Sequence, residues 1–96
     1  MKISIGLPPR PEVTDLARLA ESLGFDRLWL FDSAALYEDM WVHLALAAQA
    51  TERIGLGTGV MVPGLREVMT TASAIVTIDR LAPDRLACAV GTGGTG

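Results

Sequence analysis

The chain has 96 residues, of which 50% are hydrophobic and 20% are charged, and its formal net charge at pH 7 is −3. This length corresponds to one small domain at most, so residues 1–96 are expected to form a single partial domain. The acidic balance excludes a nucleic-acid-binding protein, because phosphate recognition needs a basic surface.

Four short apolar runs typical of strands alternate with segments of helical periodicity. The predicted strands cover residues 3–6, 27–31, 54–60 and 85–90. The predicted helices run from about residue 11 to a stop at Gly24, from residue 38 to 51, and from about residue 66 to 81. Pro8, Pro9 and Pro11 indicate a stiff loop before the first helix. Gly24 suits the position just after a helix C-cap.

The periodicity also predicts which helical residues face the sheet. They are Val13, Leu16, Ala17, Ala20 and Leu23 in the first helix, Trp41, Leu44, Ala45 and Ala48 in the second, and Val68, Ala72, Ile75 and Val76 in the third. The second strand is apolar without alternation, which is typical of strands buried on both faces of a parallel sheet. Trp29 and Trp41 are therefore expected in the core.

The third strand carries glycines at alternate positions, Gly55, Gly57 and Gly59. Side chains alternate along a strand, so all three glycines point to one face. We expect another backbone or a flat ligand to approach this face closely.

The spacing of the units predicts an α/β fold with a parallel sheet. If the strands are added in sequential order, right-handed crossovers place all helices on one side of the sheet. This arrangement corresponds to the first four strand–helix units of a (β/α)8 TIM barrel, here incomplete. A doubly wound nucleotide-binding sheet is the alternative, but the first strand lacks the glycine fingerprint of that fold.

Ligands of parallel α/β folds bind at the carboxyl ends of the strands. Residues 6–9, Asp32 with Ser33, Gly59 with Val60, and residues 91–96 lie there. The set offers backbone amides and one carboxylate but no His, Lys or Cys nucleophile, which suits a flat cofactor better than covalent catalysis. Asp32 could orient a ligand or could serve as a helix cap or turn residue.

Other candidates carry less chemistry. The spacing of residues 91–96 does not match a dinucleotide-binding loop, and a flexible glycine tail is favoured over a formed phosphate site. His43 lies inside the second helix, where a surface or packing role is expected. Glu38 and Asp39 are typical acids of a first helical turn.

A single cysteine, Cys88, excludes an internal disulfide and any multi-cysteine metal site. It lies in an apolar strand and is expected to be a small buried hydrophobic residue. The sequence shows no signal peptide and no apolar run of membrane-spanning length. We therefore expect a cytoplasmic protein with no membrane partner and no metal.

Three longer motifs carry a family resemblance. They are Glu21-x-x-Gly24-Phe25-Asp26-x-Leu28-Trp29, then Asp39-x-Trp41-x-x-Leu44-Ala45-x-Ala47-Ala48-x-x-Thr51-x-Arg53-Ile54-x-Leu56-Gly57-Thr58-Gly59-Val60 with Pro63 and Arg66, and finally Leu81-Ala82-Pro83-Asp84-Arg85-Leu86 with Val90-Gly91-Thr92-Gly93. Together they resemble the bacterial luciferase-like monooxygenase superfamily over nearly the whole chain.

The resemblance implies a (β/α)8 barrel that binds coenzyme F-420 or FMN and transfers hydride between the cofactor ring and a small organic substrate. It implies that Gly59 and Val60 form a non-prolyl cis peptide against the ring and that Asp32 faces the cofactor. Gly91, Thr92 and Gly93 match the loop that borders it. The resemblance identifies no catalytic residue, and it implies that the chain is the first part of a larger enzyme.

A second hypothesis treats the chain as a non-catalytic half-barrel that associates with itself or with a partner. Four strands leave two unpaired edges and an open apolar face. On either hypothesis we expect a homo-oligomer.

Overall fold

The computed structural model describes residues 2–92 of the chain. The strands are β1 (Ser4–Leu7), β2 (Arg27–Leu30), β3 (Gly55–Met61) and β4 (Leu86–Val90). The helices are α1 (Val13–Ser22), α2 (Met40–Ala50), the short 3-10 helix η1 (Pro63–Leu65) and α3 (Val68–Leu81). Each predicted strand and α-helix is present, with bounds that agree to within two residues.

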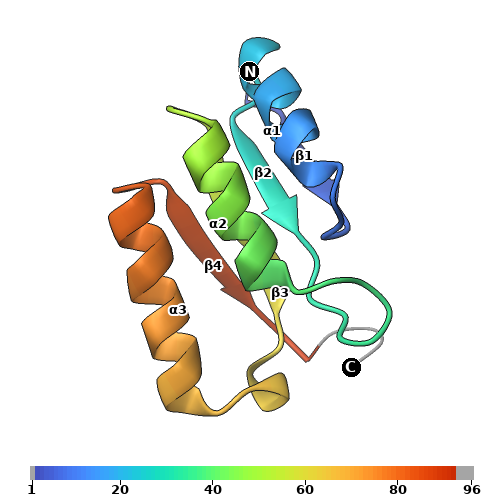
Figure 1. Ribbon diagram of the computed structural model, residues 1–96, viewed down its shortest axis with the longest axis vertical. Coiled ribbons are helices and arrows are strands. Elements are labelled where there is room, and N and C mark those ends of the chain that lie inside the picture. The colour runs from blue at the N-terminus through green and yellow to red at the C-terminus, as the bar shows by residue number, and fades with distance from the viewer. Residues whose placement is uncertain (1, 93–96) are drawn as a thin grey trace.

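The strands form one parallel sheet in the order β1-β2-β3-β4. Figure 1 shows α1, α2 and α3 on the same face of this sheet. Sequential strands with helices on one face are the arrangement of a (β/α)8 barrel, whereas a doubly wound sheet carries helices on both faces. The barrel-type prediction is confirmed, and the doubly wound alternative is wrong.

Local sequence signals explain where the helices begin and end. Asp39 is the N-cap of α2, and its side chain accepts a hydrogen bond from the Val42 N–H at 2.9 Å. Glu67 caps α3 in the same way through the Met69 N–H at 2.7 Å. Such caps satisfy amide groups that have no partner inside the helix. Gly24 follows α1 with a φ of 86°, the left-handed conformation that glycine supplies after a helix.

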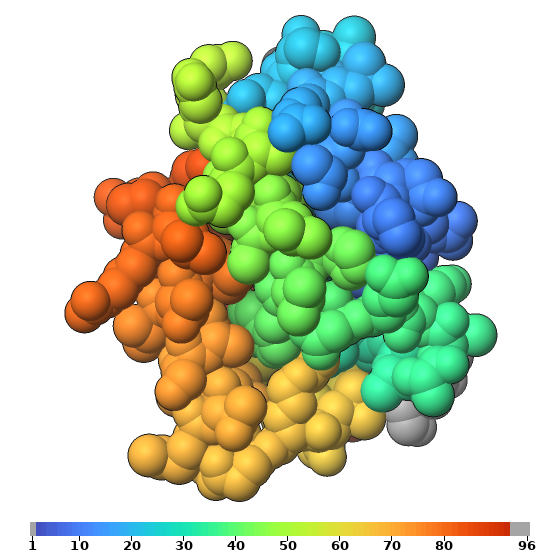
Figure 2. All heavy atoms as spheres, viewed as in Figure 1, coloured from blue at the N-terminus to red at the C-terminus, as the bar shows by residue number. Residues whose placement is uncertain are grey.

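The core lies between the helices and one face of the sheet, hereafter the helix face. Leu28, Leu30 and Leu56 project from the sheet into this core and are fully buried. Leu44 and Ala47 of α2 are also fully buried. Figure 2 shows α2, in green, between α1 in blue and α3 in orange, and α2 contacts both neighbours. The central helix therefore supplies much of the apolar contact.

Glu21 links α1 to the start of β3. Its carboxylate accepts hydrogen bonds from the backbone N–H groups of Glu52, Arg53 and Ile54, at 2.6 to 3.2 Å. Burial alone would raise the pKa of Glu21, but these backbone donors outweigh it and lower the pKa below its usual value. The ionised form is thus the one that holds the two segments together.

The predicted inner faces of the outer helices are partly wrong. In α1, Val13, Ala17 and Ala20 are buried as expected, but Leu16 and Leu23 are exposed. The two leucines flank the buried stripe, so their helical phase alone did not separate core from rim.

In α3, Val68 and Val76 are exposed, although both were expected inside. Ala72 is exposed as well, and Thr71 and Ile78 are buried in their place. Apolar residues occur on more than one side of α3, so periodicity could not select the face that meets the sheet.

Two predictions for the sheet also fail. β2 was expected to be buried on both faces, but Trp29 is only half-buried because the described helices cover one face. Cys88, expected in the core, is exposed. It lies on the edge strand β4, opposite the fully buried Thr58 of β3. Partial burial still raises the pKa of the Cys88 thiol.

Candidate functional site

The carboxyl ends of β2, β3 and β4 bring most of the predicted site residues together. Asp32 follows β2, Gly59 and Val60 lie near the end of β3, and Gly91 follows β4. The peptide bond between Gly59 and Val60 is cis, as the resemblance implies, and its place against a cofactor ring stays a prediction. Beside it, the register between β3 and β4 shifts between Thr58 and Met61.

Gly91 closes against the end of β3. Its N–H donates to the Met61 carbonyl at 3.0 Å. A Cβ atom placed on Gly91 would lie 3.1 Å from Cγ2 of Val60, a tight contact. The Val60 side chain therefore occupies the space that a side chain at position 91 would need. Thr92 is exposed at the same edge, and Gly93 lies outside the described residues.

Asp32 is buried at this edge, with only 2% of its side chain exposed. Oδ1 accepts from Nη2 of Arg66 at 2.7 Å, and Oδ2 accepts from Nη1 of Arg66 at 2.8 Å. Oδ2 also accepts from the Val62 N–H at 2.9 Å. Two parallel N–H donors from one guanidinium make this a strong, oriented ion pair. Asp32 is not the cap of α2, because Asp39 fills that role, and the Asp32 carboxylate is bound instead to the segment after β3.

The electrostatics of the pair follow from its geometry. Burial alone would raise the pKa of Asp32, but the hydrogen bonds from Arg66 and from the Val62 N–H outweigh it, so the pKa lies below its usual value. The hydrogen bonds to Asp32 raise the pKa of Arg66 in turn, and a weaker contribution comes from Asp39 at 3.7 Å. Both partners are therefore charged across the neutral pH range.

The loop between β2 and α2 folds over the same edge. The N–H groups of Leu36 and Tyr37 donate to the Ser33 carbonyl at 3.2 and 3.0 Å. The Glu38 N–H donates to the Pro9 carbonyl at 3.2 Å, which joins this loop to the one after β1. A cavity of about 210 Å³ lies beneath the loop, and the residues that line it are Asp32, Ala34, Ala35, Tyr37, Glu38, Asp39, Met40 and Arg66.

The three alternating glycines of β3 share one face, hereafter the glycine face, but that face is not bare. The guanidinium carbon of Arg27 lies 2.7 Å from an ideal Cβ at Gly55. Ring carbons of Trp29 lie 2.5 Å from an ideal Cβ at Gly57, and Cβ of Trp29 lies 3.1 Å from that of Gly59. The expected flat ligand or second backbone is therefore replaced by two side chains of β2.

These two side chains support each other. Arg27 Nη1 donates to the carbonyls of Leu56 and Arg85, both at 2.6 Å. Its guanidinium carbon lies 5.5 Å from the centroid of the Trp29 ring, within the range of a cation–π contact. The glycine face is thus packed from within the chain, and the ligand-accessible backbone is left at the strand ends.

His43 is a packing residue, as expected. It is buried, and its Nε2 lies 2.7 Å from Oε1 of Glu38. His43 Nδ1 and the neighbouring Trp41 Nε1 are buried without a hydrogen-bond partner. The contact between His43 and Glu38 joins the start of α2 to the loop before it.

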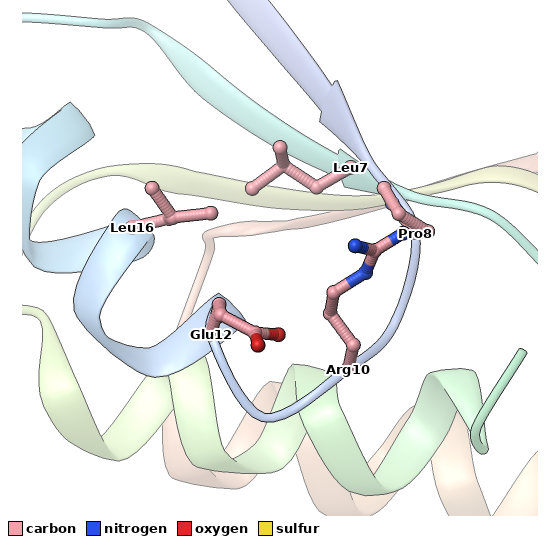
Figure 3. A pocket seen from close by; sticks show the side chains of 5 residues that line it. All are labelled: Leu7, Pro8, Arg10, Glu12 and Leu16. Atoms are coloured by element: carbon pink, nitrogen blue, oxygen red, sulfur yellow. The ribbon is translucent and has the colours of Figure 1, made fainter.

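A second hollow, of about 210 Å³, lies beside α1 and is shown in Figure 3. The side chains of Leu7 and Leu16 point toward each other across it, and Arg10 of the proline loop and Glu12, the N-cap of α1, lie at its edge. Leu7 and Pro8 belong to the strand end that the sequence placed among the ligand-binding positions, but none of the residues expected to bind the cofactor lines this hollow. Among residues 2–92, no group of three His, Cys, Asp or Glu side chains could hold a metal ion, and no helix is long and apolar enough to cross a membrane.

Sequence reasoning did not identify Arg66 or Arg27 as parts of this region. Arg66 is 34 residues from its partner Asp32, and no periodic pattern links charges over that distance. The only feature of the sequence that pointed to Arg66 was its place at the end of the longest family motif. Arg27 was read as the start of an apolar strand, and its aliphatic stem and carbonyl partners explain why a charged residue fits there.

The match to known families covers almost the whole chain. The family model described as luciferase-like monooxygenase matches residues 3–96. The 5,10-methylenetetrahydromethanopterin reductase of Methanopyrus kandleri is 34% identical over 96% of this chain and 28% of its own length. The F-420-dependent glucose-6-phosphate dehydrogenase of Intrasporangium calvum is 36% identical over 85% of this chain and 27% of its own length. The chain thus spans less than a third of the curated relatives it matches.

Solved structures agree. The structure of the coenzyme F-420-dependent tetrahydromethanopterin reductase from Methanopyrus kandleri superposes with a TM-score of 0.88 at 33% identity, covering 96% of this chain and 27% of that one. An FMN-bound type II Baeyer-Villiger monooxygenase of Pseudomonas putida gives a TM-score of 0.87 at 17% identity, covering 98% of this chain and 30% of that one. The second likeness shows the fold alone.

Proposed function

Because the chain belongs to the luciferase-like monooxygenase family, we propose that it is part of a deazaflavin- or flavin-dependent oxidoreductase. The reaction is hydride transfer between the cofactor ring and a small organic substrate. The observation that carries the proposal is the 33% identity and TM-score of 0.88 to a coenzyme F-420-dependent reductase over 96% of the chain. The substrate class stays open, since the named relatives act on chemically different molecules.

Coenzyme F-420 is the first choice of cofactor and FMN the second. The glucose-6-phosphate dehydrogenase, at 36% identity, is named as F-420-dependent, and so is the solved tetrahydromethanopterin reductase, at 33% identity. The FMN-bound monooxygenase supports only a fold that is able to hold FMN.

The residues at the strand ends fit a flat ring. Gly59 and Gly91 carry no side chains of their own, and the Cβ direction of each is filled by Trp29 and by Val60 respectively. The half-buried Val60 offers an apolar branched surface beside them. We propose that Gly59, Val60, Gly91, Thr92 and Gly93 border the cofactor. Asp32 belongs to the same proposed site, where its oxygens already accept hydrogen bonds from the protein.

The cofactor, when bound, supplies the hydride chemistry, and the protein supplies binding, orientation and electrostatics. In this chain the Val60 side chain would support the cofactor ring from one side, and apolar packing around the ring would exclude water. Side chains of Trp29 and Arg27 close the glycine face below, so the ring is held at the strand ends. No residue of this region is assigned a proton-transfer role.

Fluorescence titration with coenzyme F-420 and, separately, with FMN tests the proposal. We expect saturable binding of one cofactor, and weaker binding by a Gly91→Val variant, because its side chain would collide with Val60. Gly64→Val is the matched control, since nothing lies within 4 Å of its Cβ position. Failure of both cofactors to bind at millimolar concentration contradicts the proposal.

A second candidate function, a non-catalytic half-barrel that self-associates, is favoured by one observation. Val68, Met69 and Val76 of α3 are 74%, 72% and 52% exposed, a high exposure for apolar residues on one helix. Light scattering separates the two candidates, because a folded monomer with cofactor affinity excludes the second. The expected homo-oligomer and the cytoplasmic location remain predictions.

A further inference from the structure

We infer that Asp32 and Arg66 are a positioning pair, which fixes the backbone beside Val60 and does not itself bind the cofactor. The inference starts from how fully the Asp32 carboxylate is used. Both oxygens accept hydrogen bonds from Arg66, and one also accepts from the Val62 N–H. With 2% of its side chain exposed, Asp32 presents almost no surface to a ligand.

The contacts of Asp32 close residues 62–66, the segment after β3, into a loop that is hereafter called the staple. The first residue of the segment, Val62, and the last, Arg66, bind the same carboxylate. Between them the Leu65 N–H donates to the Val62 carbonyl at 3.2 Å, and the Arg66 N–H donates to the Pro63 carbonyl at 3.4 Å. The staple therefore has both ends anchored at the end of β2, and its interior is held by its own turn.

The staple begins two residues after Val60. Met61 lies between them, and its carbonyl accepts the Gly91 N–H at 3.0 Å. Val60 is thus followed by two residues whose backbone is held: the Met61 carbonyl accepts from Gly91, just after β4, and the Val62 N–H donates to Asp32. A change in the Asp32–Arg66 pair has a short, direct path to Val60, whereas the side chains of the pair do not need to reach a ligand.

The consequence for cofactor affinity rests on the proposed function, in which Val60 supports the ring. If the pair positions Val60, then Arg66→Lys should weaken cofactor binding in the same direction as Asp32→Asn, although lysine keeps the charge. Lysine lacks the planar fork that binds both carboxylate oxygens. A direct cofactor contact by Asp32 predicts instead that only the Asp32 variant weakens binding.

The experiment compares Asp32→Asn and Arg66→Lys with Asp15→Asn and Arg18→Lys. The control pair makes the same kinds of substitution in an exposed ion pair on α1, where the Asp15 side chain is 89% exposed. Two quantities are measured on each variant. The first is amide hydrogen exchange of Val62 and Val60 by NMR without cofactor, and the second is the dissociation constant for coenzyme F-420 and for FMN.

We expect Asp32→Asn to speed exchange at Val62 about tenfold or more, which corresponds to about 1.4 kcal/mol, and to raise the dissociation constant. Arg66→Lys should shift both readings in the same direction by a smaller factor, and the α1 controls should shift neither. If Asp32→Asn fails to fold, Arg66→Lys alone decides between the outcomes.

Two results overturn the inference: unchanged exchange at Val62 and Val60 in both variants, or weaker binding in Asp32→Asn with normal binding in Arg66→Lys. If the unsubstituted protein binds neither cofactor, the proposed function fails. The exchange readings at Val62 and Val60 then still show whether the pair holds the backbone.

Discussion

Gly57→Ala tests how tightly the glycine face is packed. An ideal Cβ at Gly57 lies 2.5 Å from two ring carbons of Trp29 and 3.1 Å from the Ala87 carbonyl oxygen. Carbon atoms in contact prefer separations of about 3.5–4.0 Å, so the ring must move by roughly 1 Å. The nearby carbonyl belongs to the backbone of β4 and limits any shift of β3 in the other direction.

The magnitude follows from two opposing terms. Forcing an extra methyl group into a packed site costs about 1–3 kcal/mol. Replacing glycine with alanine also restricts the unfolded chain, which returns about 0.4–1 kcal/mol. We therefore expect Gly57→Ala to lower the free energy of unfolding by about 1–2 kcal/mol. Gly64→Ala is the control, since nothing lies within 4 Å of its Cβ position, and it should be neutral or slightly stabilising.

The assay is urea unfolding followed by circular dichroism, with stability taken from the midpoint at constant slope. A Trp29→Leu background completes a double-mutant cycle, because a smaller side chain frees the space above Gly57. The cost of Gly57→Ala should shrink by at least about 0.5 kcal/mol in that background. The packing argument is refuted if Gly57→Ala is as stable as Gly64→Ala, or if its cost is the same with leucine at position 29.

Two further predictions concern the termini of α2 and β3. Glu21→Gln should lower the free energy of unfolding by about 1 kcal/mol at neutral pH, since a charged acceptor of backbone N–H groups is lost. The pKa of Glu21 lies below its ordinary 4.5, so this loss of stability is present above pH 4.5 and should vanish as the pH falls through the lowered pKa. Urea unfolding at several pH values checks it. Asp39→Ala should cost about 1 kcal/mol by removing the cap on the Val42 N–H, whereas Asp15→Ala, on an exposed ion pair, should cost less than about 0.5 kcal/mol in the same thermal unfolding experiment. Equal losses for the two aspartates would contradict the capping argument.

The sequence predicted the order of strands and helices because its signals are local. Apolar runs and the stop at Gly24 each act within a few residues. Asp39 was expected in the first turn of its helix and is instead the N-cap of α2, one residue earlier. The sequence predicted the inner face of α3 only in part: Ile75 packs against the core as expected, but Val68 and Val76 are exposed although they are as apolar as the buried Ile78. Which apolar side meets the sheet depends on how the neighbouring helix packs, and periodicity does not encode that contact.

The same division applies to the candidate site. The strand ends could be located, because parallel strands deliver their carboxyl ends to one edge. The partner of Asp32 could not, because its ion pair with Arg66 joins residues 34 positions apart. The glycines of β3 were correctly placed on one face, but their role was misread. A glycine reports that something lies close, and the sequence does not say whether that neighbour is a ligand or, as for Gly57, the ring of Trp29.

The side chains that cover the glycines of β3 limit where a ligand could bind. With Arg27 and Trp29 packed over the glycine face, a flat ligand cannot lie along the length of β3. The glycine at position 59 is the last of the three, and there the strand leaves its regular register with β4. Beyond that point the backbone is held by Asp32 and Arg66 from one side and by Gly91 from the other. In the proposed site, the side chains of β2 would thus confine the cofactor to the strand ends, and the ion pair between Asp32 and Arg66 would give that surface a fixed shape.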